Sequence, residues 1–302
     1  MIDIKLISLH IKKFCAKIKN DNESKKIIKE QILFHNKKLG VSYNVFDGLE
    51  LLESSILSIR KNVDYINVVY QNISNYGEIL KDDDLRLLNR LKNLKLIDNL
   101  ILYNPNLKFS SHFNEVKKRE IGLKDCLRHK CTYFLNMDTD EYYLEDQFLK
   151  AKRFIYEKDI SCTACSMYYY IKSPHYKFVE PRRSTFVPFI CKVNFRTKLK
   201  FAADSFCLVD PTRMVSYKGK VYFFAPSILA MHHMAFVRKD LRKKFRNSSY
   251  NVSQKGKNIN EEIKKSVLSY KFPDDFYFFG EGYYKIEYVE DMFNIKQTVA
   301  FL

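Results

Sequence analysis

Hydrophobic residues in the first part of the chain follow two alternating periods. Runs that fit buried strands cover residues 40–45, 65–71, 100–103 and 131–136, and the segments between them carry apolar residues at helical spacing, over residues 49–59, 84–95 and 113–128. The run at 65–71 is apolar on both faces, which is typical of a strand covered by helices on each side of a parallel sheet. The pattern therefore predicts an α/β fold with a doubly wound sheet, whose ligands bind beyond the carboxyl ends of the strands.

The helix after the first strand has a recognisable start. Asp47 precedes its first apolar residue, and Glu50 lies three residues further on. An Asp at the N-cap accepts hydrogen bonds from backbone amides that have no partner inside the helix, and an acidic third residue supports it. We therefore predict Asp47 as the N-cap of this helix.

The pattern changes after about residue 161, where shorter strand-like segments replace the regular alternation. They cover residues 163–171, 186–193 and 221–224, between prolines at 174, 181, 188, 211 and 226. A basic helix around residues 238–245, a polar stretch at 247–260, another helix and a Tyr- and Phe-rich tail follow. We therefore divide the chain into an N-terminal extension (1–39), a regular half (40–160) and an irregular half (161–302).

The N-terminal extension contains an amphipathic pattern over residues 4–19. Its apolar residues recur at helical spacing, and its lysines fall on the other side. Such a basic helix either docks on the body of the protein as an ordinary surface helix or lies in an anionic membrane interface.

Composition narrows the class of protein. With 302 residues and 46% hydrophobic content the chain can bury a sizeable core. A net charge of +17 indicates anionic partners, which include nucleic acid, acidic lipid headgroups and phosphorylated substrates, although a biased genome also yields many lysines. We find no apolar run long enough to span a bilayer and no signal-peptide pattern, so we expect a cytoplasmic protein.

The cysteine content also fits a cytoplasmic protein. Seven cysteines at irregular spacing fit reduced thiols rather than a disulfide framework. Cys162 and Cys165 form a lone C-x-x-C, and a structural zinc site would need a second pair, so we expect burial rather than metal binding.

An apolar strand that ends directly in acidic residues carries the candidate chemistry. Asp138, Asp140 and Glu141 follow residues 133–137 with only Thr139 between them. Carboxylates packed this closely raise one another's pKa unless a cation lies among them, and their oxygens suit Mg²⁺ or Mn²⁺. The alternative is a solvated acidic turn at the start of the next helix.

Three segments within residues 40–145 resemble GT-A glycosyltransferases, in particular family 2 and related families with a D-x-D-E motif. Residues 40–44 with the following apolar helix resemble their opening strand and helix. The basic helix around Arg119 and Gly122 is similar to the one that precedes their D-x-D motif, and residues 138–142 match the form Asp-x-Asp-Glu-aromatic. The resemblance implies a GT-A, Rossmann-like sheet, with a nucleotide-sugar-binding half at 40–160 and an acceptor-binding half at 161–302.

The resemblance also implies roles for individual residues. Asp138 and Asp140 would be catalytic residues that bind Mn²⁺ or Mg²⁺, and His233 would complete the metal site. Tyr43 would border the nucleotide base, Asn44 and Asp138 would contact the nucleoside, and Arg119 would lie near the diphosphate. Many family 2 enzymes carry an acidic pair after the second strand, whereas this chain has Gln71 and Asn72 there, so either Gln71 or Asn72 would take over the base or ribose contact.

The His pair and the basic residues after it leave alternatives open. Neutral imidazole is a competent ligand for Mn²⁺, and His233 is preferred over His232 only because one of two adjacent residues usually points away. A structural pair of histidines on a strand is the alternative. Arg238 and Lys239 either contact phosphates or form a solvated basic face.

The predicted reaction moves a sugar from a nucleotide-sugar donor, with a UDP-sugar favoured, to a glycan or glycolipid. The metal would stabilise the leaving diphosphate. An inverting enzyme also needs a carboxylate base, for which the irregular half offers Glu180, Asp204, Asp274 and Glu281. The charge and the basic N-terminal helix suit synthesis of a bacterial surface polysaccharide or lipooligosaccharide, with peripheral contact to an anionic membrane.

Two other functions fit parts of the pattern. A nucleotidyltransferase uses the same metal chemistry, but the acidic first loop at 46–49 lacks the Gly-rich, basic sequence usual there. A nucleic-acid-binding protein fits the charge, but it should cluster its basic residues, and here the lysines are scattered. We therefore expect no nucleic acid partner.

Overall fold

A computed structural model describes residues 12, 28, 31–183, 186–200, 212–248, 251 and 253–295. The predicted amphipathic helix at 4–19 lies outside these ranges except for Lys12. Within them, no helix combines the length and the apolar composition needed to cross a bilayer.

Four parallel strands form the regular half of the sheet. They lie in the order β3 (Asn99–Leu102), β2 (Tyr65–Tyr70), β1 (Leu39–Val45) and β4 (Tyr133–Asp138). This 3-2-1-4 order is that of doubly wound folds. β1 is almost completely buried between its two neighbours, as a central strand of such a sheet requires. The predicted α/β fold is therefore confirmed, and β4 lies two residues later than predicted.

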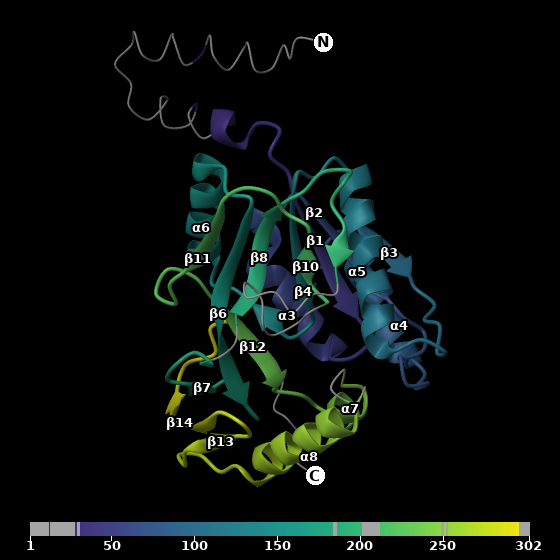
Figure 1. The fold of residues 1–302 in the computed structure, drawn as a ribbon, viewed down its shortest axis with the longest axis vertical. Helices are drawn as coiled ribbons and strands as arrows, with labels where there is room; N and C mark the ends of the chain where they lie inside the picture. Colours follow the sequence, from purple (N-terminus) through teal and green to yellow (C-terminus); the bar gives the residue numbers. More distant parts are fainter. Residues whose placement is uncertain are drawn as a thin grey trace.

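Helices cover both faces of these strands (Figure 1). Ser42 and Tyr43 point to opposite faces of β1, as successive strand residues do. Tyr43 meets α3 (Leu49–Ile59), with its hydroxyl 3.0 Å from Ser55 Oγ, and Ser42 packs under α5 (Ser111–Arg128) at Gly122. A short helix η1 (Arg60–Asn62) follows α3, and α4 (Asp82–Asn93) precedes β3.

The predicted N-cap of α3 is wrong. Gly48 occupies that position with a φ of 70°, and no side chain caps the helix. A positive φ favours glycine over an L-residue with a side chain. Asp47 instead turns its side chain toward the cavity described below, where it is part of the wall.

Several strands of the irregular half extend the same sheet. β8 (Phe186–Lys192) pairs antiparallel with both β4 and β6 (Cys162–Ile171), and β6 pairs parallel with β11 (Val221–Phe224) and β12 (Ala230–Phe236). The other elements are β5 (Glu141–Tyr142), α6 (Glu145–Lys158), β7 (Tyr176–Phe178), β9 (Leu199–Lys200), β10 (Met214–Val215), α7 (Leu241–Arg246), α8 (Gln254–Ser269), β13 (Phe276–Phe278), β14 (Gly282–Tyr284) and β15 (Ile286–Tyr288). The sheet therefore runs through the predicted boundary at residue 160.

Several helix boundaries in this half differ from the prediction. α6 was not predicted, α7 begins at Leu241 rather than near Arg238, and α8 begins inside the predicted polar stretch. The Asp240 side chain caps α7 through Lys243 N at 2.8 Å, and Ser253 caps α8 through Gly256 N at 3.1 Å. In Figure 1, α7 and α8 lie at one end of the molecule, beside the ends of β6 and β12.

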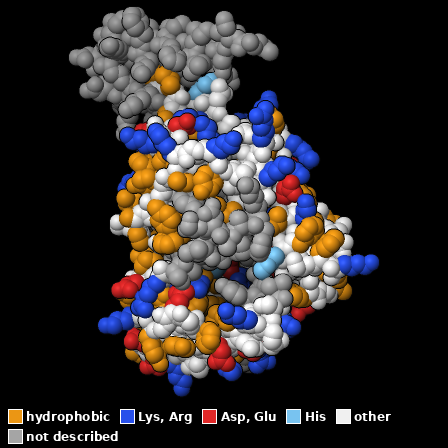
Figure 2. Space-filling model, in the orientation of Figure 1, with side chains coloured by type: hydrophobic (Ala, Val, Ile, Leu, Met, Phe, Trp, Pro, Cys, Tyr) orange, Lys and Arg blue, Asp and Glu red, His pale blue; other side chains and the backbone are white. Residues whose placement is uncertain are grey.

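The described cysteines and lysines fit the expectations from composition. Cys126, Cys131, Cys162, Cys165 and Cys191 are all buried. Lys and Arg side chains are dispersed over the face shown in Figure 2 and do not gather in one patch.

Candidate functional site

A cavity of about 610 Å³ lies where β1, β2 and β4 end. Its wall contains Asn44 and Asp47 from the end of β1, Gln71 after β2, and Asp138 and Asp140 at the end of β4. The strand order reverses between β1 and β4, and the crevice beyond such a reversal is the usual ligand site of doubly wound sheets. The acidic segment therefore lies in the position predicted for it.

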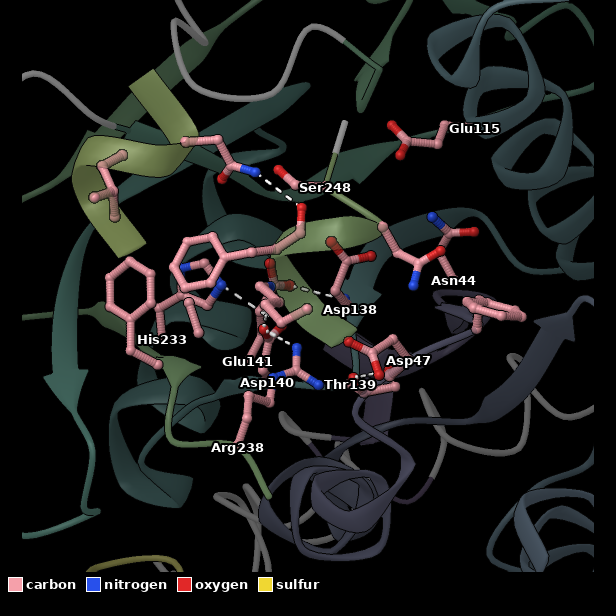
Figure 3. Close-up of a pocket in the computed structure, with 18 of the residues that line it drawn as sticks. Asn44, Asp47, Glu115, Asp138, Thr139, Asp140, Glu141, His233, Arg238 and Ser248 are labelled. Atoms are coloured by element: carbon pink, nitrogen blue, oxygen red, sulfur yellow. Dashed lines mark hydrogen bonds and ion pairs between the residues drawn. The ribbon is translucent and has the colours of Figure 1, made fainter. Parts of the chain in front are cut away.

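Asp140 is a deeply enclosed carboxylate of this cavity, with 1% of its surface exposed. Its Oδ2 accepts hydrogen bonds from the Arg238 guanidinium and, at 3.0 Å, from Lys244 Nζ. Its Oδ1 lies 3.5 Å from His233 Nε2, and Figure 3 labels Arg238 and His233 around Asp140. Burial alone would raise the pKa of Asp140, but Arg238 and Lys244 outweigh burial and hold the pKa well below its ordinary value. Asp140 is therefore ionised at neutral pH.

Gly48 allows Arg238 to reach Asp140. A Cβ on Gly48 would lie 1.2 Å from Arg238 Nη1 and 2.7 Å from Thr139 Oγ1. The close approach and the positive φ both require glycine at this position.

Asp138 and Glu141 share one arginine. Arg213 Nη2 lies 2.5 Å from Asp138 Oδ2 and 2.5 Å from Glu141 Oε1, and Arg213 Nη1 donates to Glu141 at 2.8 Å. Arg119 Nη2 lies 3.1 and 3.2 Å from the two oxygens of Asp138. Burial raises the pKa of Glu141, and Arg213 acts in the opposite direction.

The structure corrects the predicted set of metal ligands. Asp138, Asp140 and His233 all line the cavity, but Asp138 directs both oxygens at arginines. Within the part of the chain that the structure describes, no group of three or more His, Cys, Asp or Glu side chains is arranged to hold a metal ion.

Asp140 and His233 nevertheless fit an ion that takes its other ligands from a substrate. Asp140 Oδ1 and His233 Nε2 face each other at 3.5 Å, a separation that two ligands of one cation can have. Mg²⁺ is commonly held by one or two carboxylates, with phosphate oxygens and water in its remaining positions. An ion at this place would therefore fill its remaining positions with water or with the phosphate oxygens of a ligand.

The two adjacent histidines have different surroundings. His232 is buried, its Nδ1 lies 2.7 Å from the Tyr170 hydroxyl, and burial lowers its pKa to about 3. His233 lines the cavity, with its ring 4.8 Å from that of Tyr169. The structure therefore places the side chain of His233, and not that of His232, in the cavity with the acidic segment. His232 is a buried structural histidine on the strand, which was the alternative prediction for the pair.

Of the residues predicted to contact the nucleoside, some line the cavity and one does not. Tyr43 is fully buried against α3, so the prediction that it borders the base is wrong. Asn44 lines the cavity, and its buried Oδ1 has no hydrogen-bond partner among the described residues. Gln71 lines it too, with Oε1 accepting from Lys118.

Lys118 is a buried lysine in the wall of the cavity. It donates to the Val45 carbonyl at 3.1 Å as well as to Gln71. Burial lowers its pKa to about 7, against an opposing effect from Glu115. The amide of Gln71 is therefore oriented by a lysine that lies beside it on α5.

The predicted catalytic bases do not line the cavity where they can be located. Glu180 and Asp274 are exposed, and Glu281 accepts hydrogen bonds from Arg182 and Tyr284. Asp204 lies outside the described residues. The cavity wall itself offers two other carboxylates outside the arginine-bound cluster, Asp47 and Glu115.

Arg213 and Lys244 are functional candidates that sequence reasoning missed. Arg213 sits in a Pro-containing irregular segment with no recognisable pattern, and nothing in the sequence marked it. Lys244 belonged to a helix recognised only as basic. Arg119 and Arg238, which were predicted to contact phosphate, lie in the cavity wall bound to Asp138 and Asp140.

Comparisons with known proteins show only distant similarity. No protein-family model and no curated protein matches the sequence. Among solved structures, the chain is similar to residues 1–349 of S. aureus TarS in complex with UDP-GlcNAc (TM-score 0.40, 12% identity, covering 74% of this chain and 70% of that chain). It is also similar to GalNAc-T7 with UDP, GalNAc and Mn²⁺ (0.40, 9%, 75% and 48%). The mannosyltransferase PcManGT from Pyrobaculum calidifontis, in complex with GDP-Man and Mn²⁺, is more distant (0.29, 15%, 45% and 36%). Similarity at this level does not assign a function to the chain.

Proposed function

We propose that this chain is a metal-dependent glycosyltransferase that moves a sugar from a nucleotide-sugar donor to a glycan or glycolipid acceptor. One observation carries the proposal: Asp140 and His233 face each other in a cavity at the reversal point of a doubly wound sheet, among arginines that suit a diphosphate. A volume of about 610 Å³ is within the usual range for small-molecule sites. The D-x-D-E resemblance supports the same reading.

Asp140 and His233 are the residues that would hold Mn²⁺ or Mg²⁺. When bound there, the ion supplies a Lewis acid that stabilises negative charge on a departing diphosphate. Arg238 keeps Asp140 ionised and fixes its orientation, and Arg119 and Arg213 fix Asp138. The chain thus sets its carboxylates in place before any ligand arrives.

The nucleoside would bind at the ends of β1 and β2. Asn44 Oδ1 is a buried acceptor without a partner among the described residues, so it suits a hydroxyl or N–H donor on the ligand. Gln71 and Lys118 form the neighbouring wall, and Asp138 faces the same cavity. A UDP-sugar is the first donor to test.

The acceptor would bind against the wall from the irregular half. That wall is largely aromatic, from Tyr169, Phe236, Phe245 and Phe278, with Arg182 and Lys255 beside them. Apolar and aromatic walls with a few polar groups are typical of sites that enclose organic ligands, and they suit the apolar face of a sugar or part of a lipid. A surface polysaccharide or lipooligosaccharide precursor fits this wall and the net charge of +17.

The deprotonation of the acceptor, which inversion would require, needs a carboxylate near this wall. Asp47 and Glu115 line the cavity and join Asp204 as candidates. Glu180 is exposed and lies outside the cavity wall, a position that does not suit this role.

A thermal-shift panel tests the proposed function. UDP-, GDP- and CMP-sugars and CTP would be added with and without Mn²⁺ to the wild type and to Asp140→Asn, with the exposed Asp159→Asn as a matched control. We expect one sugar nucleotide to raise the melting temperature only with Mn²⁺, in the wild type and the control but not in Asp140→Asn. Stabilisation by CTP alone, or equal stabilisation of Asp140→Asn, would contradict the proposal and favour nucleotidyl transfer or another function.

Peripheral contact with an anionic membrane is a separate part of the proposal. It is supported by the basic amphipathic pattern at residues 4–19. The full chain should sediment with anionic vesicles, and a chain lacking residues 1–20 should not. Equal sedimentation of the two proteins would remove this part.

A further inference from the structure

Asp140 has two cationic partners of different character. Arg238 comes from the segment after β12 and its side chain is 4% exposed, whereas Lys244 comes from α7 and its side chain is 28% exposed. Both donate to the same oxygen, Oδ2. Two cations on one carboxylate oxygen repel each other, so the less enclosed one is held less firmly.

The backbone of α7, which carries Lys244, is held in place, whereas the Lys244 side chain is partly exposed. The Asp240 side chain caps α7, and Leu241 and Phe245 are buried under it. The lysine side chain is a flexible four-carbon stem with a compact charge, so its ammonium can change partner while the helix stays in place.

The other cations of the cluster are less able to move. Arg119 and Arg213 are 2% and 5% exposed, and each holds Asp138 together with a second residue, Thr212 for Arg119 and Glu141 for Arg213. A planar guanidinium bound to two partners cannot leave one without disturbing the other. Among the described cations on the acidic segment, Lys244 is therefore the one placed to be displaced.

We propose that Lys244 is the resident counterion of Asp140 and that a divalent cation displaces it in order to bind. The inference rests on the proposed function, because it assumes that Asp140 and His233 receive the ion. The Lys244 ammonium lies 3.0 Å from Asp140 Oδ2, so an ion that approaches Asp140 is repelled by it. The contact between Lys244 and Asp140 therefore lowers the affinity for the metal ion. The displaced ammonium remains at the cavity wall, where an anionic diphosphate would compensate it, so metal and nucleotide should bind cooperatively.

The test is the affinity for Mn²⁺ without nucleotide, measured from the electron paramagnetic resonance signal of free Mn²⁺. We expect Lys244→Met to bind Mn²⁺ roughly fivefold more tightly than the wild type, the size expected for losing one partly exposed ion pair. Lys244→Arg keeps the charge and should bind no more tightly than the wild type. Lys239→Met removes an exposed lysine nearby and is the matched control for the change in net charge.

Each outcome decides the proposal. Equal affinities for Lys244→Met and Lys239→Met would overturn it while leaving the metal site intact. Failure of every protein, Lys244→Met included, to bind Mn²⁺ would overturn it together with the proposed metal site. Thermal unfolding in EDTA checks the fold of each variant, and Lys244→Gln, which removes the charge but keeps a hydrogen-bond donor, replaces Lys244→Met if that protein does not fold.

Discussion

At the scale of single residues, Arg213 holds two neighbouring carboxylates that would otherwise repel each other. It contacts Asp138 and Glu141 through a guanidinium that is 5% exposed, and Glu141 is 1% exposed. A lysine supplies the same charge but not the fork of donors that reaches both acids. The shape of the side chain, as well as its charge, is therefore required here.

Arg213→Lys should destabilise the protein because it leaves a buried carboxylate oxygen without its donor. We expect a loss of about 1–3 kcal/mol in the free energy of unfolding, measured by urea denaturation. Arg196→Lys, at an exposed turn, is the control and should change stability by less than about 0.5 kcal/mol. Equal stabilities of the two variants would show that the bridge between the acids does not depend on the fork.

His232 predicts a pH dependence that can be assigned to one residue. Burial lowers the pKa of His232 from 6.5 to about 3. Below pH 6.5 this side chain is therefore protonated in the unfolded chain but stays neutral in the folded chain. Stability must therefore fall as the pH drops from 6.5 toward 5, by up to about 1.4 kcal/mol per pH unit from this group. His232→Asn, which keeps a partner for Tyr170, should lose less stability than the wild type over that range in urea titrations. Parallel pH profiles for the two proteins would contradict the assignment.

At the scale of elements, the contact between α5 and β1 sets how closely the basic helix approaches the sheet. A Cβ on Gly122 would lie 1.8 Å from Ser42 Oγ and 2.7 Å from Ser42 Cβ. The helix would have to move away from the sheet, and with it Lys118 and Arg119, which line the cavity. Gly122 therefore links helix packing to the geometry of the site.

Gly122→Ala should cost about 1–3 kcal/mol of stability, the usual cost of overpacking a filled interface. Ser42→Gly removes both clashing atoms, so the double variant Ser42→Gly with Gly122→Ala should lose less than the sum of the single losses. Urea denaturation of the three variants measures this coupling. Strict additivity would mean that the cost arises elsewhere.

The regular elements of the first half could be predicted because their hydrophobic period is strong and local. The errors fall where tertiary contacts override a local preference. The sequence predicts Asp47 as the N-cap, but Gly48 occupies that position because a side chain there would collide with Arg238. The sequence predicts Tyr43 as a cavity residue, but its side chain lies on the face of β1 that packs against α3.

At the scale of the whole molecule, the site is assembled from segments far apart in the sequence. Arg213 and Asp138 are 75 positions apart, and Arg238 and Lys244 lie 98 and 104 positions from Asp140. The carboxylates could be predicted because they follow a strand directly. The contacts of Arg213 and Lys244 with these carboxylates could not be predicted, since the irregular half that positions both residues has no regular period.

The central claim is that Asp140 and His233 bind a divalent ion that engages the diphosphate of a sugar nucleotide. Anomalous diffraction from crystals grown with Mn²⁺ and the nucleotide diphosphate that gives stabilisation tests it most directly. We predict a Mn²⁺ peak within about 2.0–2.4 Å of Asp140 Oδ1 and His233 Nε2, with the diphosphate beside it and the nucleoside near Asn44. Nucleotide bound outside the cavity, or a peak that contacts neither residue, would contradict the account.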